Sequence, residues 1–179
     1  MSIDRAAITS GLSELIESHL SKTGGPWAKE VSIESLDRVR PDFMSVEASK
    51  GVYAKVSNIE RACVTIYEVK SCLADYMSGN GLNDIGDFNY IVCPYELMMK
   101  VIGLVCDEKM ESKDPEGRWG WAYPFPESHG RRPCIDDLPT YEGQVDGWKL
   151  YFIPPHIQYQ RKLPISVCLY ALICAGVRR

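Results

Sequence analysis

Residues 63–71 constrain the fold of this chain more than any other stretch. They read Cys-Val-Thr-Ile-Tyr-Glu-Val-Lys-Ser, and β-branched and aromatic residues in such a run are typical of a buried strand. Successive side chains of a strand point to opposite faces, so Glu68 and Lys70 share one face while Tyr67 and Val69 point to the other. The stretch therefore predicts a sheet strand that ends in a carboxylate and an ammonium group side by side.

The preceding and following segments predict an α/β domain with a mixed central sheet flanked by helices. Residues 3–20 repeat apolar side chains at helical spacing, and Gly24 and Gly25 end that pattern. Ser71 is a suitable cap for a short helix that begins directly after it. The predicted elements up to this point are a helix (3–20), strands (27–33, 40–47 and 63–71), a helix (72–78), a strand (88–93) and a helix (95–102).

The second half of the chain predicts an extension of the same single domain, which spans residues 1–179. Short strands are expected at 104–106 and 119–123, a longer strand at 148–153, and a last helix at 165–175. Polar and proline-rich composition favours surface loops at 107–118 and 124–147. We therefore divide the chain into a core, residues 1–95, and an extension, residues 96–179.

Composition limits the kinds of partner and compartment. The net charge of −4 argues against the basic shell that non-specific nucleic-acid binding would require. It is compatible with a compact basic groove, for which the candidates are Arg38, Arg40 and Arg118. Arg118 and Trp119 are the best candidates for an exposed contact with bases. The seven cysteines are scattered singly and no signal peptide precedes them, which predicts reduced thiols and a cytoplasmic protein with no membrane segment.

Two short motifs together resemble a known nuclease family. Arg-Pro-Asp-Phe at 40–43 and Tyr-Glu-Val-Lys at 67–70 resemble the PD-(D/E)XK nuclease superfamily, whose pattern is an Asp after Pro on one strand and Glu-x-Lys on the next. The order of elements over roughly the first 95 residues is similar to its restriction-endonuclease-like αβββαβ core. The run Glu-Val-Lys-Ser followed by Ala-Asp-Tyr at 74–76 looks like its small single-domain bacterial members, which are described as DNA-repair or nuclease-like proteins.

The resemblance implies a site for Mg²⁺ or Mn²⁺ that hydrolyses DNA. Asp42, Glu68 and the main-chain carbonyl of Val69 would hold the metal, and Lys70 would be the catalytic lysine. Two carboxylates suit Mg²⁺, which keeps several of its waters, and an ammonium group can stabilise the charge that develops on a phosphate.

The resemblance also implies additional residues of the site. Glu17, or less readily Glu14, would supply an extra carboxylate from the first helix, and Ser71 and Asp75 would complete the site. Ser71 can equally be only a helix cap, and Asp75 only a surface residue of the first helical turn, where negative charge is favourable. Gly-Asn-Gly at 79–81 predicts a plain turn, because a phosphate-binding loop should follow a strand and open a helix.

An alternative function stays open. A protein of the same fold can lack activity and bind a nucleic acid or a protein partner, for example as a mobile-element or defence factor, and the acidic surface suits a protein partner. A homodimer is also compatible with the sequence. Metal binding by Asp42 and Glu68 would separate the two functions.

Overall fold

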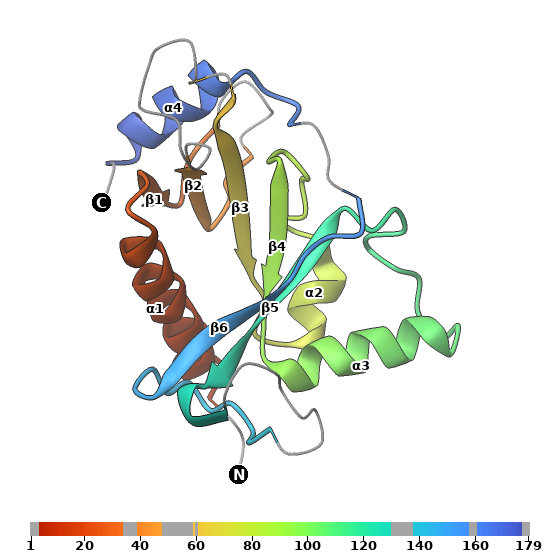
Figure 1. The fold of residues 1–179 in the computed structure, drawn as a ribbon. Coiled ribbons are helices and arrows are strands. Elements are labelled where there is room, and N and C mark those ends of the chain that lie inside the picture. Colours follow the sequence, from red (N-terminus) through yellow and green to blue (C-terminus); the bar gives the residue numbers. More distant parts are fainter. Residues whose placement is uncertain are drawn as a thin grey trace.

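The computed structural model describes residues 4–33, 39–47, 59, 61–129, 138–157 and 161–176, and contains one six-stranded sheet with four α-helices (Figure 1). The helices are α1 (Arg5–Thr23), α2 (Leu73–Ser78), α3 (Tyr95–Cys106) and α4 (Ile165–Cys174), and a short 3-10 helix, η3, spans Glu127–His129. The strands are β1 (Trp27–Lys29), β2 (Phe43–Glu47), β3 (Cys63–Val69), β4 (Phe88–Val92), β5 (Trp119–Pro126) and β6 (Trp148–Ile153).

The strands lie in the sheet in the order in which they follow along the chain. β1 pairs with β2 and β2 with β3 in antiparallel fashion, while β3, β4 and β5 are parallel, and β6 returns antiparallel to β5. α2 and α3 provide the crossovers that parallel neighbours require. The predicted α/β class with a mixed sheet flanked by helices is therefore confirmed, and the strands of the C-terminal extension continue the same sheet.

Helices cover both faces of the sheet (Figure 1). One core lies between α1 and the sheet, where Leu12 and Ile16 are fully buried together with Tyr67 and Val69 of β3. The other core lies under α2, α3 and α4, and contains Ile66 from the opposite face of the same strand. Alternation along β3 thus separates the two cores, and Glu68 and Lys70 fall on the side of Ile66.

The structure corrects several predicted boundaries. Residues 104–106, predicted as a strand, form the last turn of α3, because its apolar pattern continues past residue 102. The predicted loop at 124–147 begins too early, since β5 runs to Pro126. Ser71 is not the cap of α2: Cys72 holds that position and makes no side-chain capping hydrogen bond. Trp119, expected to be exposed, is buried in the core at the start of β5.

Within the described residues, no helix combines the length and the apolar character needed to cross a bilayer.

Candidate functional site

Asp42 and Glu68 are brought together by the register of β2 and β3. Phe43 pairs with Tyr67 in this antiparallel ladder, so Asp42, one residue before β2, lies across from Glu68. Residues directly opposite in such a pair project from the same face. The main-chain N–H of Val69 donates to Asp42 Oδ2 at 2.8 Å, and the N–H of Glu30 donates to the Asp42 main-chain carbonyl, also at 2.8 Å. Asp42 is thereby fixed through both its side chain and its main chain.

Glu68 is an ionisable residue that is almost completely buried. Its side chain is buried, with 2% of the residue exposed, and its Oε1 has no hydrogen-bond partner among the residues that the structure describes. Burial, followed by the charge and hydrogen bonding of the neighbouring Asp42 carboxyl, raises the pKa of Glu68 to about 9, although Lys70 acts in the opposite direction. Two carboxyl groups in such close contact favour a shared proton or a cation between them.

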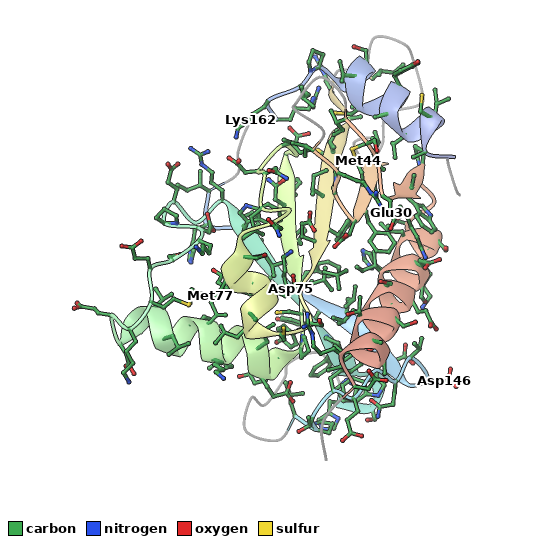
Figure 2. All side chains as sticks on the ribbon, turned by 180° about the vertical axis from the view of Figure 1, so that it is seen from behind. Glu30, Met44, Asp75, Met77, Asp146 and Lys162 are labelled. Atoms are coloured by element: carbon green, nitrogen blue, oxygen red, sulfur yellow. The ribbon has the colours of Figure 1, made fainter. Side chains whose placement is uncertain are left out.

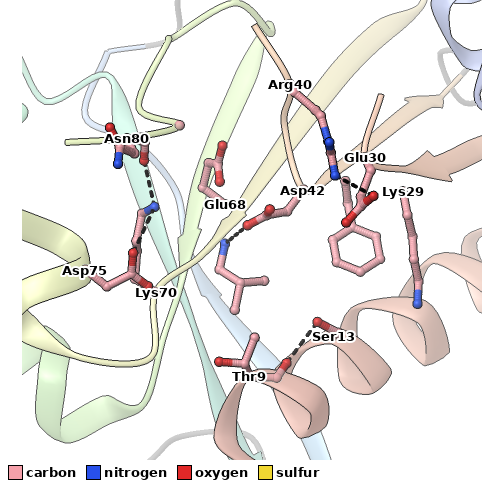
Figure 3. Close-up of a pocket in the computed structure, with 13 residues that line it drawn as sticks. Thr9, Ser13, Lys29, Glu30, Arg40, Asp42, Glu68, Lys70, Asp75 and Asn80 are labelled. Carbon is pink, nitrogen blue, oxygen red and sulfur yellow. Dashed lines mark hydrogen bonds and ion pairs between the residues drawn. The ribbon is translucent and has the colours of Figure 1, made fainter. Parts of the chain in front are cut away.

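Lys70 lies on the same face as Glu68 and is almost completely buried. Its main-chain N–H donates to the carbonyl of Val92 at 2.9 Å, which extends the pairing of β3 with β4. Its Nζ donates to the main-chain carbonyl of Asn80 at 2.6 Å and lies 3.7 Å from Oδ1 of Asp75 (Figure 3). The ammonium group is therefore held between helix α2 and the turn that follows it.

These groups line a pocket of about 470 Å³ between α1, the start of β2, the end of β3 and the turn after α2 (Figure 3). Both polar and apolar side chains form its walls, and the pocket is open to solvent on one side. Its lining residues are Thr9, Ser13, Lys29, Glu30, Arg40, Asp42, Phe43, Glu68, Val69, Lys70, Asp75, Asn80 and Gly81.

Asp75 belongs to this pocket and is not simply a surface residue of the first helical turn. Its carboxylate is the ion-pair partner of Lys70, and its Oδ2 accepts a hydrogen bond of 3.4 Å from the main-chain N–H of Ser71. Figure 2 shows it on the side of α2 that faces the strands, whereas Met77 points away from them. Ser71 itself does not line the pocket. Its main-chain N–H contacts the pocket residue Asp75.

The structure does not bring Glu17 to the pocket. Its carboxylate forms an ion pair with Lys29, and α1 presents the hydroxyl groups of Thr9 and Ser13 to the pocket instead. The pocket lies beside the first half of α1, at Thr9 and Ser13, whereas Glu17 lies further along the helix. The weakly expected extra carboxylate of the first helix is thus absent from the lining residues.

The three arginines predicted to contact nucleic acid differ in their position relative to the pocket. Arg40 lines the pocket, with an exposed side chain that pairs with Glu30 at 2.5 Å. Arg118 does not line it: it pairs with Asp84 at 2.5 Å and with Glu116, and so belongs to a separate cluster of ion pairs. Arg38 lies outside the described residues.

Sequence reasoning missed the part played by Asn80 and Gly81. Gly81 has φ of +84°, and a Cβ atom placed on it would lie 2.0 Å from Oε1 of Glu68. The Gly-Asn-Gly segment was correctly predicted as a turn, but its position over Glu68 depends on the length of α2, which the sequence leaves open. The sequence signal that could have indicated this turn as part of the site is a glycine-rich segment soon after the Glu-x-Lys strand.

The donor set at this pocket suits a hard cation with few protein ligands. Among the described residues, no group of three or more His, Cys, Asp and Glu side chains is arranged to hold a metal ion. Asp42 and Glu68 are the two carboxyl groups that lie opposite each other in this pocket. The partnerless buried Oε1 of Glu68 is an oxygen that a cation would satisfy. Two carboxylates with additional water are an arrangement typical of Mg²⁺ sites.

Comparison of the chain with known protein families, with curated proteins and with solved structures gives no match in any of the three.

Proposed function

We propose that this protein is a metal-dependent nuclease that hydrolyses phosphodiester bonds in DNA. One observation carries the proposal: Asp42 and Glu68 meet across β2 and β3, and the buried ammonium group of Lys70 lies on the same face. A carboxylate pair with an adjacent ammonium group is the set of groups that phosphoryl hydrolysis with a divalent cation requires.

The order of elements supports the same proposal. α1, β1, β2, β3, α2 and β4 follow one another in the αβββαβ order that the resemblance implies. We infer that these elements form a restriction-endonuclease-like core, to which β5, β6 and α4 are added. The positions of the motif residues support this inference: Asp42 directly precedes β2, Glu68 lies near the end of β3, and Lys70 directly follows it.

Each residue of the site has a distinct role in the proposed reaction. Asp42 and Glu68 would hold Mg²⁺ or Mn²⁺, with the main-chain carbonyl of Val69 as a third oxygen. The bound ion would supply charge stabilisation and a water of lowered pKa. Lys70 donates to a non-bridging phosphate oxygen or to the attacking water, and Asp75 keeps the ammonium group in place.

The rim of the pocket supports a phosphate-bearing substrate. Arg40 and Lys29 place two cationic side chains beside the carboxylate pair, and the Thr9 and Ser13 hydroxyl groups lie on the α1 wall. The pair of Arg40 with Glu30 is exposed, and such pairs are weak, so a phosphate can replace Glu30 without a large penalty. The pair of Lys29 with Glu17 is partly buried. We therefore place the DNA backbone across this rim.

The test is cleavage of linear, circular, branched and single-stranded DNA with Mg²⁺ or Mn²⁺, together with calorimetry of Mn²⁺ binding. Wild-type protein should bind Mn²⁺ and cut at least one substrate, and a chelator should abolish cutting. Glu68→Gln should remove both properties while the protein stays folded. Absence of both Mn²⁺ binding and cleavage in the wild type would reject the proposal, and DNA binding under those conditions would favour an inactive nuclease-fold protein.

A further inference from the structure

The turn formed by Asn80 and Gly81 is rigidly built. The main-chain N–H of Asn80 donates to the hydroxyl group of Ser78 at 3.2 Å, and the N–H of Asn83 donates to the carbonyl of Gly81 at 2.9 Å. Before the turn, Gly79 ends α2 in a left-handed conformation and donates to the carbonyl of Tyr76. Hydrogen bonds therefore fix the turn on both sides.

The turn supplies the nearest acceptor of Lys70. The 2.6 Å hydrogen bond from Lys70 Nζ to the Asn80 carbonyl is shorter than the 3.7 Å separation from Asp75, and only 5% of the lysine side chain is exposed. A main-chain acceptor on a rigid turn cannot change rotamer, so it holds the ammonium group in one place. The position of Lys70 thus depends on the position of this turn.

The same turn closes over Glu68. The Cα atom of Gly81 packs directly on the carboxyl group, since an added Cβ would lie 2.0 Å from Oε1, 2.3 Å from Cδ and 2.5 Å from Oε2. This close approach covers the carboxyl group of Glu68 on the side of the turn. Only glycine satisfies both this contact and the positive φ.

We propose that the Asn80–Gly81 turn is a positioning element of the catalytic centre: its carbonyl orients the Lys70 ammonium group, and its glycine closes the site over Glu68. The inference rests on the proposed nuclease activity for its catalytic part, and on geometry alone for the placement of Lys70. Neither residue was expected at the site, because the contact to Lys70 uses the main chain and the contact to Glu68 uses the absence of a side chain.

Gly81→Ala and Gly79→Ala form a matched pair of variants that tests the proposal. Both glycines have positive φ, +84° and +68°, so alanine introduces similar backbone strain at each. A Cβ on Gly79 meets no atom of the described residues within 4 Å, whereas a Cβ on Gly81 collides with Glu68. A difference between the variants therefore reports the contact with the site and not the strain.

The first readout needs no activity. Metal-free protein is treated with an acylating reagent at neutral pH, and mass spectrometry follows Lys70 with exposed Lys100 as the internal reference. Gly81→Ala should raise the acylation rate of Lys70 relative to Lys100 by about tenfold or more, as expected for local opening of a buried group, and Gly79→Ala should not. Equal rates in the two variants would overturn the positioning role.

The second readout is a stability cycle that holds even if Gly81→Ala unfolds the wild-type background. In protein that carries Glu68→Ala, the collision is gone, so Gly81→Ala and Gly79→Ala should lower the melting temperature by the same amount. In the wild-type background, Gly81→Ala should lower it more. An equal difference between the variants in both backgrounds would show that the turn does not rest on Glu68.

The third readout is kinetic and separates this inference from the proposed function. With Mn²⁺, Gly81→Ala should lower kcat by about 10- to 100-fold with little change in KM. A small displacement of the Lys70 ammonium group from its catalytic position is enough for a loss of this size. Gly79→Ala should leave kcat unchanged. Wild-type protein that does not cut at all would overturn the proposed function and the catalytic part of the inference. The first readout would still decide the placement of Lys70, and the second would still decide the contact of Gly81 with Glu68.

Discussion

Oδ2 of Asp42 accepts a 2.8 Å hydrogen bond from the main-chain N–H of Val69, the residue between Glu68 and Lys70. This bond extends the pairing of β2 and β3 by one step beyond the last ladder pair, Phe43 with Tyr67. Asp42 therefore has a structural role as well as its proposed role as a metal ligand, and the two roles can be separated by substitution.

Asp42→Asn should keep the fold and remove the metal site. The amide oxygen can still accept from Val69, but the negative charge is lost, so Mn²⁺ binding and cleavage should fall below detection at nearly unchanged melting temperature. Asp42→Ala leaves the Val69 N–H without its partner and should in addition cost about 1–3 kcal/mol of stability. Chemical denaturation and calorimetry of both variants provide the measurement, and equal stability of the two would contradict the structural role.

The pH dependence of stability should report Glu68. Its pKa is raised from an ordinary value of 4.5 to about 9, so folding favours its protonated form. The resulting stabilisation is fully present below pH 4.5 and is lost as the pH rises toward 9, at a rate of up to about 1.4 kcal/mol per pH unit. Metal-free wild-type protein should therefore lose stability across this range.

Glu68→Gln is the control for this dependence because glutamine has the same shape and does not titrate. The difference in melting temperature between variant and wild type should grow from pH 5 to pH 9 in favour of the variant. Addition of Mg²⁺ at the upper end should stabilise the wild type only, because a ligand stabilises the state that binds it. A pH profile that is parallel in the two proteins would show that Glu68 titrates normally.

The sequence predicted most of the fold because its strongest signals are local. Alternation in β3 placed Glu68 and Lys70 on one face, and helical spacing located α1 and α4 to within a few residues. The boundaries that failed are those where local pattern is ambiguous: an apolar tripeptide at 104–106 suits a strand or a helix equally, and the structure resolves it as part of α3.

The site was predictable only where contacts follow from register. Asp42 and Glu68 meet because two neighbouring strands pair, which a motif on each strand can indicate. The contact of Lys70 with the Asn80 carbonyl depends on a main-chain atom, and the pairing of Glu17 with Lys29 depends on how α1 packs on the sheet. Neither contact can be predicted from residue type or from spacing along the sequence.

Lys70 should contribute to the rate and not to metal affinity. Lys70→Met keeps an unbranched apolar stem in the buried position of Lys70 but removes the ammonium group. We therefore expect kcat to fall by about 100- to 1,000-fold, the range for loss of one charge-stabilising donor. Mn²⁺ affinity should be unchanged or higher, since a neighbouring positive charge has been removed. Loss of Mn²⁺ binding in this variant, with the fold intact by circular dichroism, would contradict the assigned role.

Arg40 and Arg118 should separate DNA binding from stability. Arg40 lines the pocket, and its pair with Glu30 is exposed on both sides, with 56% and 67% of the side chains accessible, so Arg40→Gln should leave stability unchanged. If Arg40 contacts a phosphate, the Arg40→Gln variant should bind DNA more weakly, and the slope of log K against log salt should fall in magnitude by about 1.

Arg118 pairs with Asp84, which also pairs with Lys162 at 2.7 Å, so Arg118→Gln should lower the melting temperature and leave the salt slope unchanged. Fluorescence anisotropy with labelled DNA and a chelator, conditions under which the proposed mechanism allows no cleavage, measures both slopes. An equal change of slope in the two variants would place the DNA elsewhere than the pocket rim.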